Sequence, residues 1–206
     1  VAAGVDRWLA GLGNQSEAWN LPKFMVATGM IFTVLEEQLG VAKHAALHDP
    51  LTGLPNRRLF AQRLDAALER ARSDRRRIAL LVIDMDDFKQ VNDTRGHATG
   101  DAVLAAAATR LQSRLRVTDT LARLGGDEFA AILPEPGPDE AIASQVDRLL
   151  SALRAGFAIE GERIVVQASI GVALYPADGE DEAGLLAAAD RAMYAHKFTA
   201  RDPRGD

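Results

Sequence analysis

The chain has 206 residues, 48% of them hydrophobic, which is enough for one folded domain with an additional element. Its formal net charge of −5 is unlike that of proteins that grip a nucleic-acid backbone, so no nucleic-acid polymer is expected as a partner. The absence of cysteine excludes disulfides and thiolate metal sites, and is typical of a reducing compartment such as the cytoplasm.

Residues 1–47 are predicted to form a linker that contains one long helix. From Pro22, apolar or small residues recur every three or four positions as far as Ala46, a helical period close to that of a coiled-coil seam. Two interpretations remain open: a helix packed on its own domain, or a stalk that pairs two copies and transmits a signal. The apolar tract at 24–35 is shorter than the roughly 20 residues that cross a bilayer. Because the sequence begins with Val, we expect a fragment, whose longer parent could still be membrane-tethered.

Residues 48–206 are predicted to form a second unit. Asn56 can cap a first helix, and the continuous apolar run at 78–83 is typical of a buried central strand. Further helices are expected over 99–115, from Pro138 and over 182–197, with a hairpin at 116–133 and one long, half-buried strand at 163–174. The order β-α-β-β-α-β-α indicates an α/β sandwich with helices packed on a mainly antiparallel sheet.

Acidic residues gather at the end of the central strand and at the hairpin tip. Asp84 and Asp86 would point to the same face, because side chains in a strand alternate with a period of two. If the hairpin pairs beside this strand, Asp84 converges with Asp127 and Glu128 of the tip. Carboxylates without histidine or cysteine are ligands of a hard cation, Mg²⁺ or Mn²⁺, which would remove their mutual repulsion. The alternative is that these are solvated turn acids.

Gly125 and Gly126 at the tip supply the positive φ of a primed hairpin turn, and they leave room for a bulky ligand. An acidic metal site beside small residues suits a nucleoside triphosphate, although the P-loop sequence is absent. Lys89, Lys197 and Arg201 are candidates to bind its phosphates. Lys197 and Arg201 are four residues apart and share a helix face if the last helix extends that far.

Five stretches, in their order and spacing, resemble the GGDEF domain, the diguanylate cyclase family, over about residues 48–201. They are "DPLTGLPNRR" (49–58), "DMDDFKQVNDTRGHATGD" (84–101), "RVTDTLARLGGDEF" (116–129), "ASIGVALYP" (168–176) and "ADRAMYAHK" (189–197). The resemblance implies a nucleotidyl-cyclase-like, ferredoxin-like palm with an N-terminal helical stalk. It also implies an enzyme that condenses two GTP into cyclic di-GMP and two pyrophosphates, with one GTP on each subunit of a homodimer.

The resemblance further implies roles for individual residues. It implies that Asp84 binds Mg²⁺ or Mn²⁺ through its carboxylate and Met85 through its carbonyl, with Glu128 as a further ligand. Asp127 matches the catalytic acid position, close to the metal and the attacking hydroxyl. Asn92 and Asp101 match the guanine-reading positions.

The same resemblance places Lys197 and Arg201 at phosphate-binding positions. The departure in "FTARD", where Ala200 stands in place of the family's glycine and Asp202 in place of its asparagine, puts the role of Arg201 in question.

A second site is implied by Arg116 and Asp119, which match an R-x-x-D motif placed five residues before the GGDEF tip. Strand geometry puts Asp119 roughly 17 Å from the tip, so the pair cannot belong to the metal site. The implied role is product inhibition by cyclic di-GMP, and the alternative is a surface ion pair. A rival to the whole enzymatic reading is a catalytically silent module that binds GTP or cyclic di-GMP and signals through partner contacts.

Overall fold

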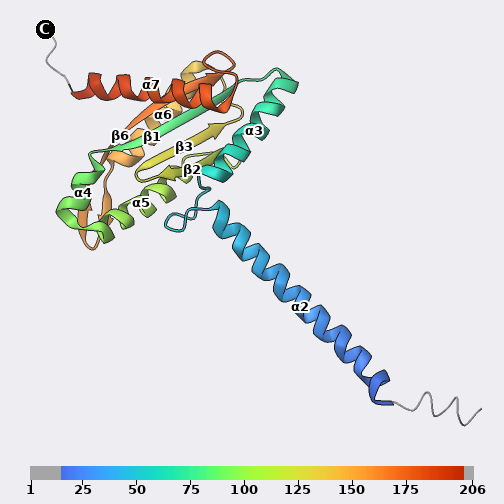
Figure 1. Cartoon of the computed structure of the whole chain (residues 1–206). Helices are drawn as coiled ribbons and strands as arrows, with labels where there is room; N and C mark the ends of the chain where they lie inside the picture. The colour runs from blue at the N-terminus through green and yellow to red at the C-terminus, as the bar shows by residue number, and fades with distance from the viewer. Residues whose placement is uncertain (1–14, 202–206) are drawn as a thin grey trace, which may run out of the picture. The chain divides into compact units, whose positions relative to one another are not determined.

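The computed structural model describes residues 15–201, apart from the side chains of some residues in the first and last helices (Figure 1). The chain divides between Ala46 and Leu47 into two units, which are described separately. The side chain of Arg201 and the first fourteen residues of the predicted linker lie outside the described part.

The first unit is helix α2 (Gln15–Leu47), which carries several exposed apolar side chains. The helix begins before the predicted start at Pro22, because the preceding residues include good helix formers such as Glu17 and Ala18. The helix ends at Leu47, the last residue of the predicted linker. No helix within residues 15–201 is both long and apolar enough to cross a membrane.

The second unit is built on a four-stranded antiparallel sheet in the order β2-β3-β1-β6. Its strands are β1 (Ile78–Asp86), β2 (Thr120–Gly125), β3 (Glu128–Leu133) and β6 (Gln167–Tyr175). The predicted central strand is therefore correct, with β3 on one side of β1 and β6 on the other. It continues beyond the apolar run through Asp84 and Asp86, which were expected at its end.

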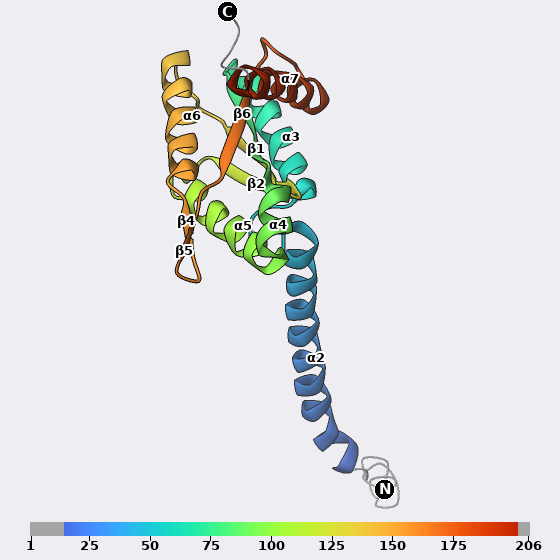
Figure 2. The same ribbon diagram turned by 90° about the vertical axis from the view of Figure 1, so that its left-hand side faces the viewer.

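Helices cover both faces of this sheet, as the two views of the chain show (Figures 1 and 2). One face packs against α3 (Arg57–Asp74) and α7 (Glu182–Arg201). The other packs against α4 (Phe88–Arg95), α5 (His97–Gln112) and α6 (Asp139–Arg154). Two apolar cores result, one on each side of the sheet, which confirms the predicted antiparallel sandwich.

The single strand predicted at 163–174 is wrong, because the chain breaks at residues 165–166. β4 (Phe157–Ile159) and β5 (Glu162–Ile164) form a separate hairpin, and β6 starts only at Gln167. Glu160 and Gly161 between β4 and β5 both have positive φ, as a type I′ turn requires. The apolar alternation continues through the break, so periodicity alone does not reveal it.

Helix α4 is absent from the predicted elements. It begins after Asp87, which adopts a left-handed conformation with φ 52°, and ends at Gly96, with φ 84°. Asp tolerates this region better than most residues. The sharp change of direction at Gly96 separates α4 from α5.

Strand β6 is buried on both faces rather than half-buried, because α7 covers the face that carries Gly171 and Ala173. A Cβ at Gly171 would lie 1.9 Å from the carbonyl oxygen of Ala189 and 2.5 Å from the amide nitrogen of Met193. Glycine is therefore required here so that the helix backbone can approach the strand.

We expect Gly171→Ala to lower the free energy of unfolding by about 3 kcal/mol or more, because backbone rather than a flexible side chain would have to move. Urea denaturation followed by circular dichroism measures the loss. Gly29→Ala on α2 is the matched control, since nothing lies within 4 Å of the added methyl, and it is expected to cause no loss. Equal stability of Gly171→Ala and the unsubstituted protein would contradict this packing.

Candidate active site

The end of β1 presents Asp84 and Asp86 on the sheet face covered by α7. The ammonium of Lys197, on α7, lies 2.5 Å from Oδ1 of Asp84 and 3.4 Å from Oδ1 of Asp86. Burial lowers the pKa of Lys197, but the hydrogen bond and charge of Asp84, together with Asp86, outweigh it and raise the pKa. The lysine is thus a firmly held cation at the acidic end of the strand.

The hairpin brings its two tip acids to this place, as predicted. Glu128 is the direct cross-strand partner of Asp84 in the β1–β3 ladder, and such partners have Cβ atoms about 5 Å apart. Asp127 lies in the adjoining turn, where its backbone oxygen accepts a hydrogen bond from the Met85 amide at 3.4 Å. Burial, together with the charge of Asp84, raises the pKa of Asp127.

The turn itself needs glycine for its backbone conformation. Gly125 has φ 148° and Gly126 has φ 52°, both in the region that L side chains rarely adopt. A Cβ at either position would meet nothing within 4 Å. The surface beside the turn is open, as the sequence predicted for the approach of a bulky ligand.

The segment of residues 48–57, called the strap below, is connected to the turn through the side chain of Arg123. Nη1 of Arg123 donates to both carboxylate oxygens of Asp49 at 3.0 Å, while its Nε and Nη2 donate to the carbonyl of Gly126 at 3.0 and 2.7 Å. Burial raises the pKa of Asp49, but hydrogen bonds from Thr52 and Arg123 outweigh this and lower it. Arg57, at the start of α3, lies 3.7 Å from Glu128. The Arg123 guanidinium therefore connects the strap to the active-site turn.

The predicted guanine-reading residues stand on two neighbouring helices, Asn92 on α4 and Asp101 on α5. Asn92 packs over Gly100, where an added Cβ would lie 1.9 Å from its Oδ1, and Asp101 is the next residue. Asp101 and Lys89 are exposed, so both are accessible to a ligand.

The Arg116–Asp119 segment forms a turn between α5 and β2, away from the acidic cluster. Asp119 accepts a hydrogen bond from the backbone amide of Arg116 at 2.8 Å, and the Arg116 guanidinium donates to the carbonyl of Glu135 at 3.4 Å. Burial raises the pKa of Asp119. Both residues line a cavity of about 300 Å³, and the carboxylate of Asp119 caps the backbone of the turn.

The chemistry of the donor set fits a hard divalent cation. Asp84, Asp127 and Glu128 offer carboxylate oxygens, the ligands that Mg²⁺ prefers. Among the side chains that the structure describes, no three acidic or histidine residues already surround a common point. A metal bound here would use the Asp84 carboxylate, which Lys197 contacts in this structure.

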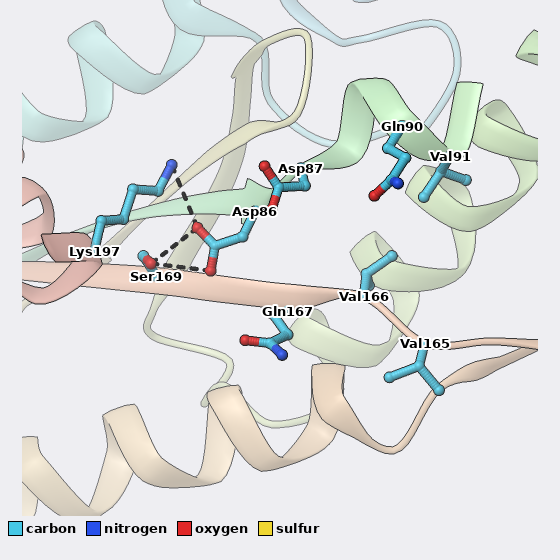
Figure 3. A pocket seen from close by; sticks show the side chains of 9 residues that line it. All are labelled: Asp86, Asp87, Gln90, Val91, Val165, Val166, Gln167, Ser169 and Lys197. Carbon is cyan, nitrogen blue, oxygen red and sulfur yellow. Dashed lines mark hydrogen bonds and ion pairs between the residues drawn. The ribbon is translucent and has the colours of Figure 1, made fainter. Parts of the chain in front are cut away.

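A cavity of about 410 Å³ adjoins the cluster (Figure 3). It is lined by Asp86, Ser169 and Lys197 on one side and by Gln90 on α4 on the other. Its position next to the carboxylates, between α4 and α7, suits a charged ligand that reaches the end of β1.

Comparison with known proteins decides the family. The model of the family described as "Diguanylate cyclase, GGDEF domain" matches residues 46–203. The chain belongs to this GGDEF family. MucR of Pseudomonas aeruginosa, named as a bifunctional diguanylate cyclase and cyclic di-GMP phosphodiesterase, is 43% identical over 157 residues, which cover 76% of this chain and 23% of MucR.

Solved structures of GGDEF proteins have the same fold. The GGDEF domain of TpbB, a diguanylate cyclase of Pseudomonas aeruginosa, matches with a TM-score of 0.71 at 42% identity, covering 74% of this chain and 89% of that structure. The coiled coil and GGDEF domain of DgcB from Caulobacter crescentus, in complex with c-di-GMP, matches with a TM-score of 0.80 at 28% identity, covering 87% and 95%. The chain spans 23% of the length of MucR and 39% of that of TpbB.

Within this GGDEF domain, sequence reasoning missed the residues that hold the site in place. Asp49, Arg57 and Arg123 stand in stretches that match the family, but only the structure gives them a contact. Ser169 likewise lies in a matching stretch, and its hydroxyl donates to Asp86. The sequence signal that could have identified these residues is a charged or hydroxyl side chain at the end of a buried element that has no evident partner nearby in the sequence.

Proposed function

We propose that the chain is a Mg²⁺- or Mn²⁺-dependent diguanylate cyclase that condenses two GTP into cyclic di-GMP and two pyrophosphates. The observation that carries the proposal is the convergence of Asp84, Asp127 and Glu128 beside Lys197 at the GGDEF turn. Family membership supports the same reaction. The cytoplasm, where GTP is abundant, is the proposed location.

In this proposal each residue has a limited task. Asp84 and Glu128, with the carbonyl of Met85, would hold the metal, which when bound would supply positive charge to neutralise the triphosphate. Asp127 lies at the attacking 3′-hydroxyl, where a carboxylate can take up the proton that is released. In each half-reaction a 3′-oxygen–phosphorus bond forms, the bond from the α-phosphorus to pyrophosphate breaks, and pyrophosphate leaves.

The remaining binding residues would contact either the guanine base or the phosphates of the nucleotide. Asn92 and Asp101 would read guanine, since a carboxylate can accept from its N1–H and N2–H₂ groups and an amide can both donate and accept. Lys197 would bind phosphates, with Lys89 and Arg201 as further candidates.

A homodimer is proposed because each 3′-hydroxyl must attack the GTP of the other subunit. Helix α2 supports a pairing role, since Met25, Met30, Ile31, Phe32 and Leu35 are each more than half exposed. Apolar side chains so exposed on one helix are typical of a surface that packs against another copy. Residues 1–47 would then be a separate signalling and dimerisation segment and residues 48–206 the catalytic domain.

Incubation of product-free protein with GTP, Mg²⁺ and a cyclic di-GMP phosphodiesterase tests the proposal. We expect continuous formation of pyrophosphate and of the linear dinucleotide, and no turnover once EDTA removes the metal. A dimeric protein that binds GTP but forms neither product would contradict the proposal. That outcome would support the alternative of a catalytically silent GTP or cyclic di-GMP receptor.

The second site is proposed to mediate product inhibition. Cyclic di-GMP carries phosphates and guanine edges that an arginine can bind in bidentate fashion. We expect Arg116→Ala to raise the cyclic di-GMP concentration needed for half-maximal inhibition at least tenfold, with the initial rate retained. Arg114→Ala, which removes a nearby exposed arginine that lies outside the Arg116 cavity, is the matched control. Unchanged inhibition in Arg116→Ala would overturn this assignment.

A further inference from the structure

The Lys197 ammonium is shared unequally between two carboxylates. It lies 2.5 Å from Asp84 and 3.4 Å from Asp86, and all three side chains are at most a quarter exposed. Burial of this degree distinguishes the arrangement from a mobile surface ion pair, which contributes little. The lysine is thus placed at one of the two oxygens that Asp84 could offer a metal.

Asp86 is itself fixed from the neighbouring strand. The Ser169 hydroxyl lies 3.0 and 3.1 Å from the two oxygens of Asp86 and has one proton to donate (Figure 3). A carboxylate has about four lone-pair positions, so Asp86 keeps acceptor capacity for the ammonium. Asp86 can therefore hold Lys197 without the help of Asp84.

An ammonium and a divalent cation at the Asp84 carboxylate oppose each other, because like charges a few ångströms apart repel. Mg²⁺ binds carboxylate oxygen at about 2.1 Å, so an ion bound to Asp84 would lie close to the ammonium at its present position and be repelled by it. The cavity lined by Lys197 and Asp86, whose lining does not include Asp84, offers space into which the ammonium can move. A short displacement of the ammonium would free the metal ligand.

We propose that Lys197 competes with the metal for Asp84, and that Asp86, held by Ser169, retains the ammonium when Asp84 binds the metal. Asp86 and Ser169 are thus positioning residues for a lysine that passes from a carboxylate to the incoming triphosphate. The proposal rests on the proposed function, because it takes Asp84 as a metal ligand. It predicts ordered binding, in which the divalent ion enters together with the nucleotide whose phosphates attract Lys197.

Titration of the nucleotide-free protein with Mn²⁺, followed by electron paramagnetic resonance, tests the competition without any measurement of activity. We expect Lys197→Met to bind Mn²⁺ at least tenfold more tightly than the unsubstituted chain. Arg191→Met removes one positive charge from an exposed position on the same helix, α7, and is expected to change the affinity less than twofold. Equal affinities of Lys197→Met and Arg191→Met would overturn the competition.

Two additions separate this inference from the proposed function. Lys197→Gln repeats the titration with a polar side chain, and a melting temperature near that of the unsubstituted chain shows that either variant is folded. Asp84→Asn, titrated with Mn²⁺ in the presence of 3′-deoxy-GTP, should lose most of the metal affinity. If Asp84→Asn binds Mn²⁺ as the unsubstituted chain does, the metal site of the proposed function fails, whatever Lys197 does.

The role of Ser169 is tested by its effect on substrate binding. We expect Ser169→Ala to raise the KM for GTP at least threefold and to change kcat by a smaller factor, since Lys197 would lose its fixed partner. Ser169→Thr keeps the hydroxyl and should restore the KM. A KM within the error of the unsubstituted value in Ser169→Ala would contradict the positioning role.

Discussion

Asp127→Asn is expected to reduce cyclic di-GMP formation at least about 100-fold while the protein remains as stable as before, or becomes slightly more stable. A positioned carboxylate that takes up a proton contributes roughly 10²- to 10⁴-fold to a rate. Burial and the charge of Asp84 both raise the pKa of Asp127, so its ionised form is disfavoured in the folded chain. The asparagine amide carries no charge and cannot take up the proton, so the substitution removes the unfavourable charge and the catalytic group at once.

The measurement is the initial rate of product formation, paired with urea denaturation of the same preparation. Asp190→Asn is the matched control, because it replaces an exposed aspartate on α7 by the same amide. It should change neither rate nor stability appreciably. A rate in Asp127→Asn within tenfold of the unsubstituted chain would remove Asp127 from the proposed chemistry.

Arg123→Ala is expected to have the largest effect on stability among the site residues. Arg123 is 12% exposed and Asp49 18%, and the substitution leaves the Asp49 carboxylate without this partner and the Gly126 carbonyl without two donors. Loss of one partner of a largely buried ion pair costs about 3 kcal/mol. Because the turn also carries Asp127, we expect the rate to fall at least tenfold.

Urea denaturation of Arg123→Ala, Asp49→Ala and the double variant measures the coupling between the two side chains. Arg57→Ala is the control, since its ion pair with Glu128 is exposed and worth at most about 1 kcal/mol. The folded-state pKa of Asp49 lies below its ordinary value of 3.8. The coupling free energy between Arg123 and Asp49 should therefore be fully present above pH 3.8 and disappear as the pH falls through the lowered pKa of Asp49. Additive effects of the two single substitutions at pH 7 would contradict the strap.

The sheet could be predicted where the sequence repeats a simple pattern. The run at 78–83 contains no polar residue, because helices cover both faces of β1. An uninterrupted apolar run of this kind predicts a central strand. The contacts at the end of that strand could not be predicted in the same way. Asp84 and Asp86 remain in β1 because Lys197 and Ser169, distant in sequence, hold their carboxylates.

The predicted strand at 163–174 and the missing helix α4 have a different origin. Alternation persists from Ile164 to Val166 although the chain leaves one hairpin and enters another sheet there, so the period carries no information about the break. Gly96, with its positive φ, ends α4 abruptly. A helix of this length has too few turns to display a clear apolar stripe.

The convergence of the site acids could be predicted because it depends on strand register alone. Once the hairpin pairs with β1, Glu128 must lie opposite Asp84 or close to it. The supporting contacts could not be predicted, because they depend on how separate elements pack. Arg123 reaches Asp49 across 74 positions, and Lys197 reaches Asp84 across 113.

The most direct test of the central claim is the location of the metal in crystals grown with Mn²⁺ and 3′-deoxy-GTP, which lacks the attacking hydroxyl. We expect the anomalous signal of Mn²⁺ to lie within coordination distance of the Asp84 and Glu128 carboxylates, with the triphosphate beside Lys197. A Mn²⁺ ion bound to the nucleotide elsewhere on the domain, with Asp84 still paired to Lys197, would contradict the account.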